Sequence, residues 1–371
     1  MSTASKEMET RQEVIDGGLL VYLSSPQEAA KIAGLTVAGG KPAVSFMKNG
    51  EYQSEATDTS ITQVRITSSE GERYFKKIAS DSELKATAWV ETDAAGNVAK
   101  DNCNVTLCYG GYTGKLPPDN GPDGQAIQNI LAGNMNPQNA LVPAFVEKAL
   151  DNAKALGAVT EVTNYGHSMG ASNAMLSNAL SAKQVRNSDA VLIEPLRAKQ
   201  AVPQLVREFG VSEAEVEANT VSVWATQGGK RFAMSEGMLG PGVGQQKLVE
   251  TDKKSATMQT ALEGHKAFNI SSVEGGLSRG APPSAAGNAP AEEDTSQSQQ
   301  ASRQPDLGQM IIGILQGLLS GGGFGDLFAS LLQGFGPQNF QGQLADQGNS
   351  MISAGTVGIG MAGAGNGRGR I

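Results

Sequence analysis

The chain has 371 residues, enough for one large domain or two of ordinary size, and a formal net charge of −8. This negative charge, together with the lack of a basic cluster interleaved with aromatic residues, argues against nucleic-acid binding. Because there are only two cysteines and two histidines, a structural zinc site is close to excluded, and we expect neither a metal nor a cofactor.

The N-terminus and the cysteines bear on the cellular compartment. The N-terminal stretch is polar and acidic and has no apolar signal-peptide core. We therefore expect a cytoplasmic protein, or one exported by a route that needs no N-terminal signal peptide. Cys103 and Cys108 lie on opposite faces of one predicted strand, which makes a disulfide between them implausible. We expect both to be small buried hydrophobic residues.

Residues 1–100 are predicted to be rich in β-structure. After a helical or disordered lead-in at 1–16, the apolar run Gly17–Leu23 predicts a strand and Pro26–Ala33 a short helix. From residue 39 onward, polar and apolar residues alternate between frequent turn residues, which predicts a twisted antiparallel sheet. Its clearest parts are two strands and a turn, at Ile61–Thr67, Leu84–Thr92 and Asp93–Asn97. The sequence leaves open whether this portion is a separate domain or extends the main sheet.

Strands and helices alternate in the predicted core at 101–272, as in a parallel sheet covered by helices on both faces. The strand Asn104–Tyr109 opens into the loop Gly110–Gly114, and residues 115–136 are predicted to be rich in loops. The later helices are predicted at Pro137–Leu156, directly after residue 170, at Ala198–Phe209, at Ser212–Ala218 and within 256–270. The later strands are predicted up to Tyr165, at Ala190–Ile193 and at Thr220–Thr226, followed by a surface loop at Met234–Gly244.

Beyond residue 272 the composition changes, and three segments are predicted: a disordered linker at 273–306, an apolar amphipathic segment at 307–336 and a Gly-rich tail at 337–371. The linker has almost no large apolar side chain, so it cannot bury enough surface to offset its ordering entropy. The apolar segment keeps helical spacing, but Gln309, Gln316 and Asp326 argue against a membrane-spanning helix. We expect it to associate with a membrane surface or a protein partner; packing on the main domain is the alternative.

The pentapeptide Gly166-His167-Ser168-Met169-Gly170 is the segment most informative about function. It lies between a predicted strand and a helix rich in small residues, and Gly-x-Ser-x-Gly at such a junction is the pattern of a nucleophile elbow. The turn must be tight to push the Ser168 hydroxyl clear of the backbone, and the glycines leave room for the neighbouring strand and helix. The alternative is an ordinary glycine-bounded turn in which Ser168 caps the helix.

The same string resembles the Gly-His-Ser-Leu-Gly-Gly of lipase-type α/β-hydrolases, with Met169 in place of Leu and Ala171 in place of the last Gly. The order of elements over about residues 100–270 agrees with that family, in which a strand opens into a loop and a long helix crosses over to the elbow strand. The resemblance implies an α/β fold with a mostly parallel α/β-hydrolase-like sheet. It also implies a serine esterase or lipase that cleaves a carboxylic ester through an acyl-enzyme on Ser168.

Catalysis by Ser168 would need a base and an acid that orients the base. His167 lies inside the elbow, where its side chain points away from Ser168, so His265 is the candidate base. The family usually carries its acid after the strand predicted at Thr220–Thr226, but no carboxylate follows directly there. Glu194, at the end of the preceding strand, is therefore the candidate acid. Weaker candidates are Asp189 and Asp252.

Two backbone N–H groups are the candidate oxyanion donors. One is that of Met169, and the other is that of Gly111 or Tyr112, in the loop where related enzymes place this donor; a flexible turn is the alternative. Two functions remain open. One is an esterase or lipase acting on an ester or lipid substrate. The other is a non-catalytic α/β-hydrolase-like scaffold whose segment 307–336 mediates membrane or protein association.

Overall fold

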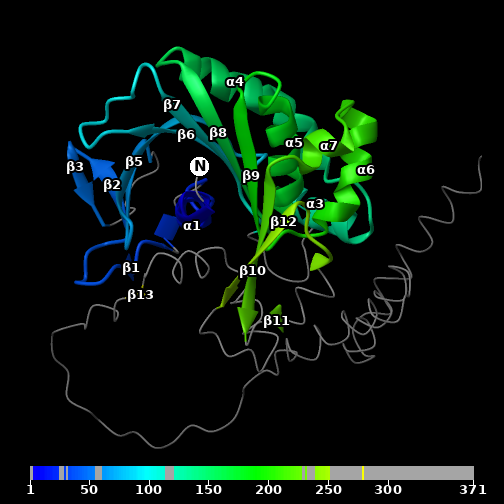
Figure 1. The fold of residues 1–371 in the computed structure, drawn as a ribbon, viewed down its shortest axis with the longest axis horizontal. Coiled ribbons are helices and arrows are strands. Elements are labelled where there is room, and N and C mark those ends of the chain that lie inside the picture. Colours follow the sequence, from blue (N-terminus) through cyan, green and yellow to red (C-terminus); the bar gives the residue numbers. More distant parts are fainter. Residues whose placement is uncertain are drawn as a thin grey trace, which may run out of the picture. The chain divides into compact units, whose positions relative to one another are not determined.

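The computed structural model describes residues 3–24, 29–30, 32–54, 61–112, 121–227, 230–231, 239–250 and 278–279 (Figure 1). Several predicted features lie outside these ranges, namely the first part of the loop at Met234–Gly244, the helix within 256–270, the apolar segment 307–336 and the tail 337–371. Of the linker 273–306, only residues 278–279 are described. Among the described residues, no helix combines the length and apolar character needed to cross a membrane.

An 11-stranded mixed sheet runs through the described chain in the order β11-β10-β9-β8-β7-β6-β5-β4-β2-β3, with β12 also pairing with β10. Its strands are β2 (Val44–Lys48), β3 (Glu51–Gln53), β4 (Gln63–Ser68), β5 (Gly71–Asp81), β6 (Ala86–Thr92), β7 (Cys103–Tyr109), β8 (Val159–His167), β9 (Asn187–Ile193), β10 (Thr220–Gln227), β11 (Lys230–Arg231) and β12 (Gln245–Glu250). A separate two-stranded pair joins β1 (Leu35–Thr36) to β13 (Ser278–Arg279).

The sheet has a parallel half and an antiparallel half. Strands β7, β8, β9, β10 and β12 pair parallel with one another, whereas β2 to β6 form antiparallel pairs. The short strand β11 pairs antiparallel with β10. The two halves meet where β6 pairs antiparallel with β7, from Ala86 opposite Tyr109 to Val90 opposite Val105. The strands before residue 100 therefore extend the main sheet, one of the two possibilities that the sequence left open. Because these strands are antiparallel, the whole sheet is mixed, and the expected parallel arrangement applies to β7, β8, β9, β10 and β12.

Helices cover both faces of this sheet. They are α1 (Thr3–Leu20), α3 (Pro122–Leu131), α4 (Val142–Lys154), α5 (Ala171–Ser181), α6 (Ala198–Phe209) and α7 (Glu213–Glu217), with short 3₁₀ turns η1 (Pro137–Leu141) and η2 (Ser168–Gly170). Figure 1 shows the blue helix α1 on one side of the strands and the green helices α4 to α7 on the other. Cys108 faces the α1 side and Cys103 the opposite side, and both are free, as the alternation along β7 predicted.

The elements with strong local patterns lie where the sequence predicted them. Helix α6 has the predicted bounds, and the helix predicted at Pro137–Leu156 is η1 continued by α4. At α7 the predicted capping box is confirmed, because the Glu215 N–H donates to Ser212 Oγ at 3.1 Å and the Ser212 N–H donates to the Glu215 carboxylate at 2.6 Å.

The prediction of a strand at Gly17–Leu23 is wrong. Helix α1 continues to residue 20, and a turn at Val21–Ser24 follows. A Cβ on Gly17 would lie 2.3 Å from the Tyr165 ring, so this glycine lets the helix rest directly on the sheet. A short apolar run that is buried all round looks the same in a helix as in a strand, which is why the sequence pattern misled.

The prediction that residues 115–136 are rich in loops misses helix α3. Pro122 occupies the first turn of this helix and Asp123 supplies an acidic residue near the N-terminus, where both are favourable. The helix buries Ala126, Ile127 and Ile130 on one side. The Gly, Pro, Asn and Asp residues around it gave the segment the composition of a loop.

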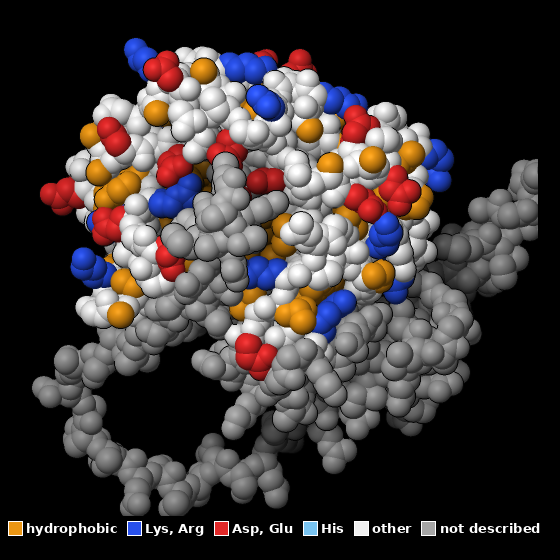
Figure 2. Space-filling view, in the orientation of Figure 1, with side chains coloured by type: hydrophobic (Ala, Val, Ile, Leu, Met, Phe, Trp, Pro, Cys, Tyr) orange, Lys and Arg blue, Asp and Glu red, His pale blue; other side chains and the backbone are white. Residues whose placement is uncertain are grey.

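On the face that Figure 2 shows, the described surface is mixed in charge, with acidic and basic side chains interspersed. Among the described residues, Leu248 is the large hydrophobic side chain that stands out, at 52% exposed. An isolated exposed leucine of this kind is ordinary for a folded protein and needs no partner to explain it.

A partly buried ion-pair network joins α1 to the antiparallel half of the sheet. Asp16 of α1 is 1% exposed and pairs with Arg73 of β5. Arg73 also donates two hydrogen bonds to the Glu91 carboxylate of β6, of 3.0 and 2.8 Å. Gln12, one turn before Asp16, donates to its carboxylate at 2.9 Å. Burial raises the pKa of Asp16 to about 6 against the lowering effect of Arg73.

We predict that Asp16→Asn changes how stability depends on pH. Because the pKa of Asp16 is raised from 3.8 to about 6 in the folded protein, its stabilising contribution is full below pH 3.8 and is lost as pH rises through about 6. The free energy of unfolding of wild type minus that of the variant should fall by roughly 2–3 kcal/mol between about pH 4 and pH 7. Denaturant unfolding of both proteins at several pH values measures this difference, and a constant difference would contradict the prediction.

Candidate active site

Three neighbouring strands end together at the carboxyl edge of the parallel half of the sheet. Tyr109 of β7 lies opposite Gly166 of β8, and His167 lies opposite Ile193 of β9. The loop Gly110–Tyr112, Ser168 and Glu194 therefore follow one another across adjacent strands. The carboxyl edge of parallel strands is where ligands bind in open α/β sheets, so a functional site is expected at this edge.

Ser168 has a left-handed backbone. Its φ is +54°, whereas His167 before it is extended and Gly170 after it is right-handed helical. A non-glycine residue pays about 1–2 kcal/mol for this conformation, and such strain is common at functional sites. The turn at Ser168, called the elbow below for its shape alone, connects β8 to α5 through η2, and Ser168 is 6% exposed. The Ser168 carbonyl is held by the Leu196 N–H at 3.0 Å.

The glycines on either side of Ser168 are required by close contacts. A Cβ on Gly166 would lie 2.7 Å from Ala171 Cα and 2.8 Å from Ala174 Cβ, both on α5. A Cβ on Gly170 would lie 2.4 Å from the carbonyl oxygen of Tyr109, at the end of β7. One glycine therefore lets the helix approach the strand, and the other lets the turn approach the neighbouring strand.

We predict that Gly170→Ala destabilises the protein by at least about 2 kcal/mol. The backbone of Gly170, at φ −70°, is one that alanine adopts readily, so the cost comes from the clash with the Tyr109 carbonyl, which no side-chain movement relieves. Gly34→Ala is the matched control, since a Cβ there meets no atom within 4 Å. Thermal or denaturant unfolding checks both variants, and equal stability of the two would refute the steric role of Gly170.

His167 lies on the α1 side of the elbow. It is 9% exposed, and its ring centroid is 6.2 Å from that of Tyr22. A Cβ on Gly111 would lie 2.7 Å from His167 Nδ1, so the loop after β7 runs tightly along this ring. The glycine at position 111 is thus explained in part by room for His167, a reason that the sequence did not suggest.

Glu194 is completely buried beside the elbow, with φ +48°. Its N–H donates to the Val223 carbonyl at 2.9 Å, and its carboxylate accepts a hydrogen bond from the Ala225 N–H of β10. The structure therefore brings the backbones of Ser168 and Glu194 together, with the Glu194 carboxylate bonded to the neighbouring strand.

The other candidates for the triad are placed less favourably or lie outside the described residues. His265 and Asp252 lie outside the described ranges. Asp189 is four positions before Ile193 on β9, which puts it about 13 Å down the strand from the elbow. It faces Glu13 of α1 and Glu161 of β8 there, with their carboxylate oxygens within 4.8 Å of one another. Asp189 is thus too far away to serve a base beside Ser168.

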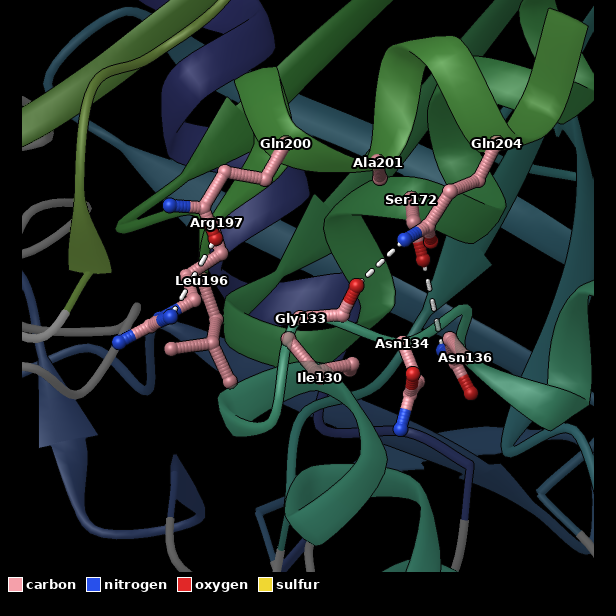
Figure 3. Close-up of a pocket in the computed structure, with 10 residues that line it drawn as sticks. All are labelled: Ile130, Gly133, Asn134, Asn136, Ser172, Leu196, Arg197, Gln200, Ala201 and Gln204. Atoms are coloured by element: carbon pink, nitrogen blue, oxygen red, sulfur yellow. Dashed lines mark hydrogen bonds between the residues drawn. The ribbon is translucent and has the colours of Figure 1, made fainter. Parts of the chain in front are cut away.

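An apolar cluster covers the edge next to the elbow. Its buried members are Ala126, Ile127, Ile130, Met169, Leu196, Trp224 and Leu239. Tyr112 packs against this cluster, and the Arg231 guanidinium lies 3.3 Å from the centroid of the Trp224 ring. A shallow hollow opens beside the cluster, between the end of α3, α6 and the start of α5 (Figure 3). It has room for little more than a water molecule, so it does not hold a substrate in this form.

Sequence reasoning missed a buried amide network behind the elbow. Asn136 is 1% exposed and donates to the Met169 carbonyl at 3.3 Å and to Ser172 Oγ at 3.4 Å. Asn139 donates to Ser172 Oγ at 3.2 Å and to Asn173 Oδ1 at 2.7 Å. An asparagine directly before Pro137 is a typical N-cap signal, and it would have located Asn136 at the start of a helix, although not its contact with Met169.

Comparisons with known proteins give little support of their own. No protein-family model matches the chain, and no curated protein matches it. Thirteen chains of solved structures match. One of them is Est1E from Butyrivibrio proteoclasticus, at 12% sequence identity and a TM-score of 0.25, covering 52% of this chain and 96% of that one. At this identity and TM-score the likeness decides nothing about function, which has to be inferred from the residues around Ser168.

Proposed function

We propose that the chain is a serine hydrolase of the α/β-hydrolase type that cleaves a carboxylic ester through an acyl-enzyme on Ser168. The observation that carries this proposal is the left-handed backbone of Ser168, at φ +54°, in the turn from β8 to α5. Strand β8 lies between the parallel strands β7 and β9. The close contacts at Gly166 and Gly170 support it, because they supply the steric reason for the Gly-x-Ser-x-Gly pattern. A serine that only caps a helix would be extended and would need neither glycine.

In the proposed reaction Ser168 Oγ attacks the ester carbonyl while His265 takes its proton. His265 then returns that proton to the departing alcohol, leaving the acyl group on Ser168. Water attacks the acyl-enzyme with the same base, and the carboxylic acid is released. Glu194 is the proposed acid that orients His265 and stabilises its charged form.

The proposed oxyanion donors are the N–H of Met169 and that of Gly111 or Tyr112. Met169 lies in η2, immediately before α5, where the positive end of the helix dipole adds to the stabilisation of a developing negative charge. Gly111 follows β7 and runs along His167, on the neighbouring strand, so the second donor would come from the side of the elbow opposite Glu194.

We predict that a fluorophosphonate probe labels the wild-type protein and does not label Ser168→Ala. The probe reacts with a serine hydroxyl that has an active base beside it, so the substitution removes the only proposed acceptor. Labelling is read by gel or mass spectrometry, alongside hydrolysis of short p-nitrophenyl esters. Equal labelling of both proteins, or wild-type esterase activity no higher than background, would argue against the proposal.

We also predict that His265→Ala lowers the esterase rate by about 10²–10⁴-fold, the usual contribution of a general base. His167→Ala tests the other histidine of the chain. Because its ring lies toward Tyr22, its loss should change stability rather than the pH dependence of the rate. If His265→Ala keeps the wild-type rate, the base assignment is wrong while the role of Ser168 can stand.

The second candidate is a non-catalytic scaffold of the same fold, with association through segment 307–336. One observation favours it: the Glu194 carboxylate is fully buried and bonded to the backbone of β10, as expected of a residue that only joins two strand ends. A wild-type protein that neither reacts with the probe nor hydrolyses esters would support this candidate.

A further inference from the structure

The peptide between Ser168 and Met169 carries the proposed oxyanion donor, the Met169 N–H. The orientation of this peptide is fixed by a hydrogen bond to its carbonyl group. A trans peptide is planar, so its C=O and N–H point in opposite directions. The Ser168 C=O accepts the Leu196 N–H at 3.0 Å. This hydrogen bond therefore also sets the direction in which the Met169 N–H points.

The following peptide is held by Asn136. The Asn136 amide donates to the Met169 C=O at 3.3 Å and to Ser172 Oγ at 3.4 Å, the second of which Figure 3 shows as a dashed line. Its Oδ1 accepts the Gln138 N–H at 3.0 Å and so caps η1. Because the cap uses the oxygen, the NH₂ group is left to face Met169, and both ends of the amide are assigned by their partners.

Burial makes this arrangement rigid. Asn136 is 1% exposed, Asn139 is completely buried, and Asn139 holds the same Ser172 hydroxyl at 3.2 Å. Water does not readily replace hydrogen bonds in such a site, so the Asn136 amide keeps the partners it has. The peptides before and after Met169 are thus both fixed, by Leu196 on one side and by Asn136 on the other.

We propose that Asn136 is a positioning residue that holds the Met169 N–H in the direction needed to stabilise an oxyanion at Ser168. The inference rests on the proposed function of Ser168. Donors that are aimed before the reaction begins lower the barrier because no reorganisation is needed when charge develops. Without Asn136 the Met169 carbonyl loses its side-chain partner, and the peptide after Met169 can rotate. The Leu196 N–H then holds the peptide before Met169 alone, which leaves the Met169 N–H less firmly aimed.

The test separates positioning from helix capping and from stability. Asn136→Ser keeps a good N-cap, but its short side chain does not reach the Met169 carbonyl. Asn136→Ala removes both roles. Asn178→Ala is the matched control, because Asn178 is also 1% exposed and lies on α5, yet its amide donates to Ala218 O at 2.8 Å and accepts from Ser188 Oγ at 2.7 Å.

We predict that Asn136→Ser and Asn136→Ala lower kcat for a p-nitrophenyl ester by about 10–100-fold, less than the 10²–10³-fold typical of deleting an oxyanion donor. The KM should stay within about twofold of wild type, because ester binding before attack does not need the donor. Inhibition by a trifluoromethyl ketone, which forms an oxyanion on the serine, should weaken in parallel with kcat. Asn178→Ala should lower the melting temperature but keep kcat within about twofold.

Three outcomes would overturn the inference: wild-type kcat in Asn136→Ser, an equal loss of kcat in Asn178→Ala, or failure of Asn136→Ser to fold while Asn178→Ala folds. Each would assign Asn136 a structural role only, with the activity of Ser168 in the wild-type protein left intact. A wild-type protein without esterase activity or probe labelling would instead refute the proposed function itself, and with it the oxyanion that Asn136 is proposed to serve.

Discussion

The left-handed turn at Ser168 is the constraint on which the carboxyl edge of the sheet depends. A serine at φ +54° is disfavoured by about 1–2 kcal/mol, so contacts around it must hold it in place. The Leu196 N–H binds its carbonyl, α5 packs against Gly166 on one side, and the end of β7 packs against Gly170 on the other. These contacts use backbone atoms, which leave little room for the turn to relax.

The strain extends along the same edge. Glu194, at φ +48°, and Arg197, at φ +49°, stand on either side of Leu196. Two left-handed residues so close together turn the chain sharply between β9 and α6, and this turn brings the Leu196 N–H back to the elbow. The strain at Glu194 and Arg197 and the support of Ser168 are therefore parts of one arrangement, of the kind that persists when the surrounding structure over-determines it.

Several elements could be predicted because their signals are local. The buried positions of α4 recur at helical spacing, the Ser212 and Glu215 pair that caps α7 is three residues apart, and the elbow is a pentapeptide. The last turn of the N-terminal helix α1, beyond the lead-in predicted at 1–16, could not be predicted in this way. The run at Gly17–Leu23 is buried in a cluster with distant parts of the chain, where Gly17 lies against Tyr165. Neither its composition nor its period therefore distinguishes a helix from a strand. Helix α3 was hidden by the loop-like composition around it.

The sequence by itself located the strand before Ser168 and the helix after it, and it named Ser168 and Glu194 as candidates for the nucleophile and the acid. The tertiary structure alone decided that the N-terminal strands extend the main sheet through β6 and β7, and that α1 is fastened by Asp16 and Arg73. It alone also showed that the Asn136 amide binds the Met169 carbonyl, although the two residues are thirty-three positions apart in the chain. The physical reason is that sheet pairing, ion pairs and amide-to-backbone hydrogen bonds join residues distant in sequence, and such partners leave no periodic pattern in the chain.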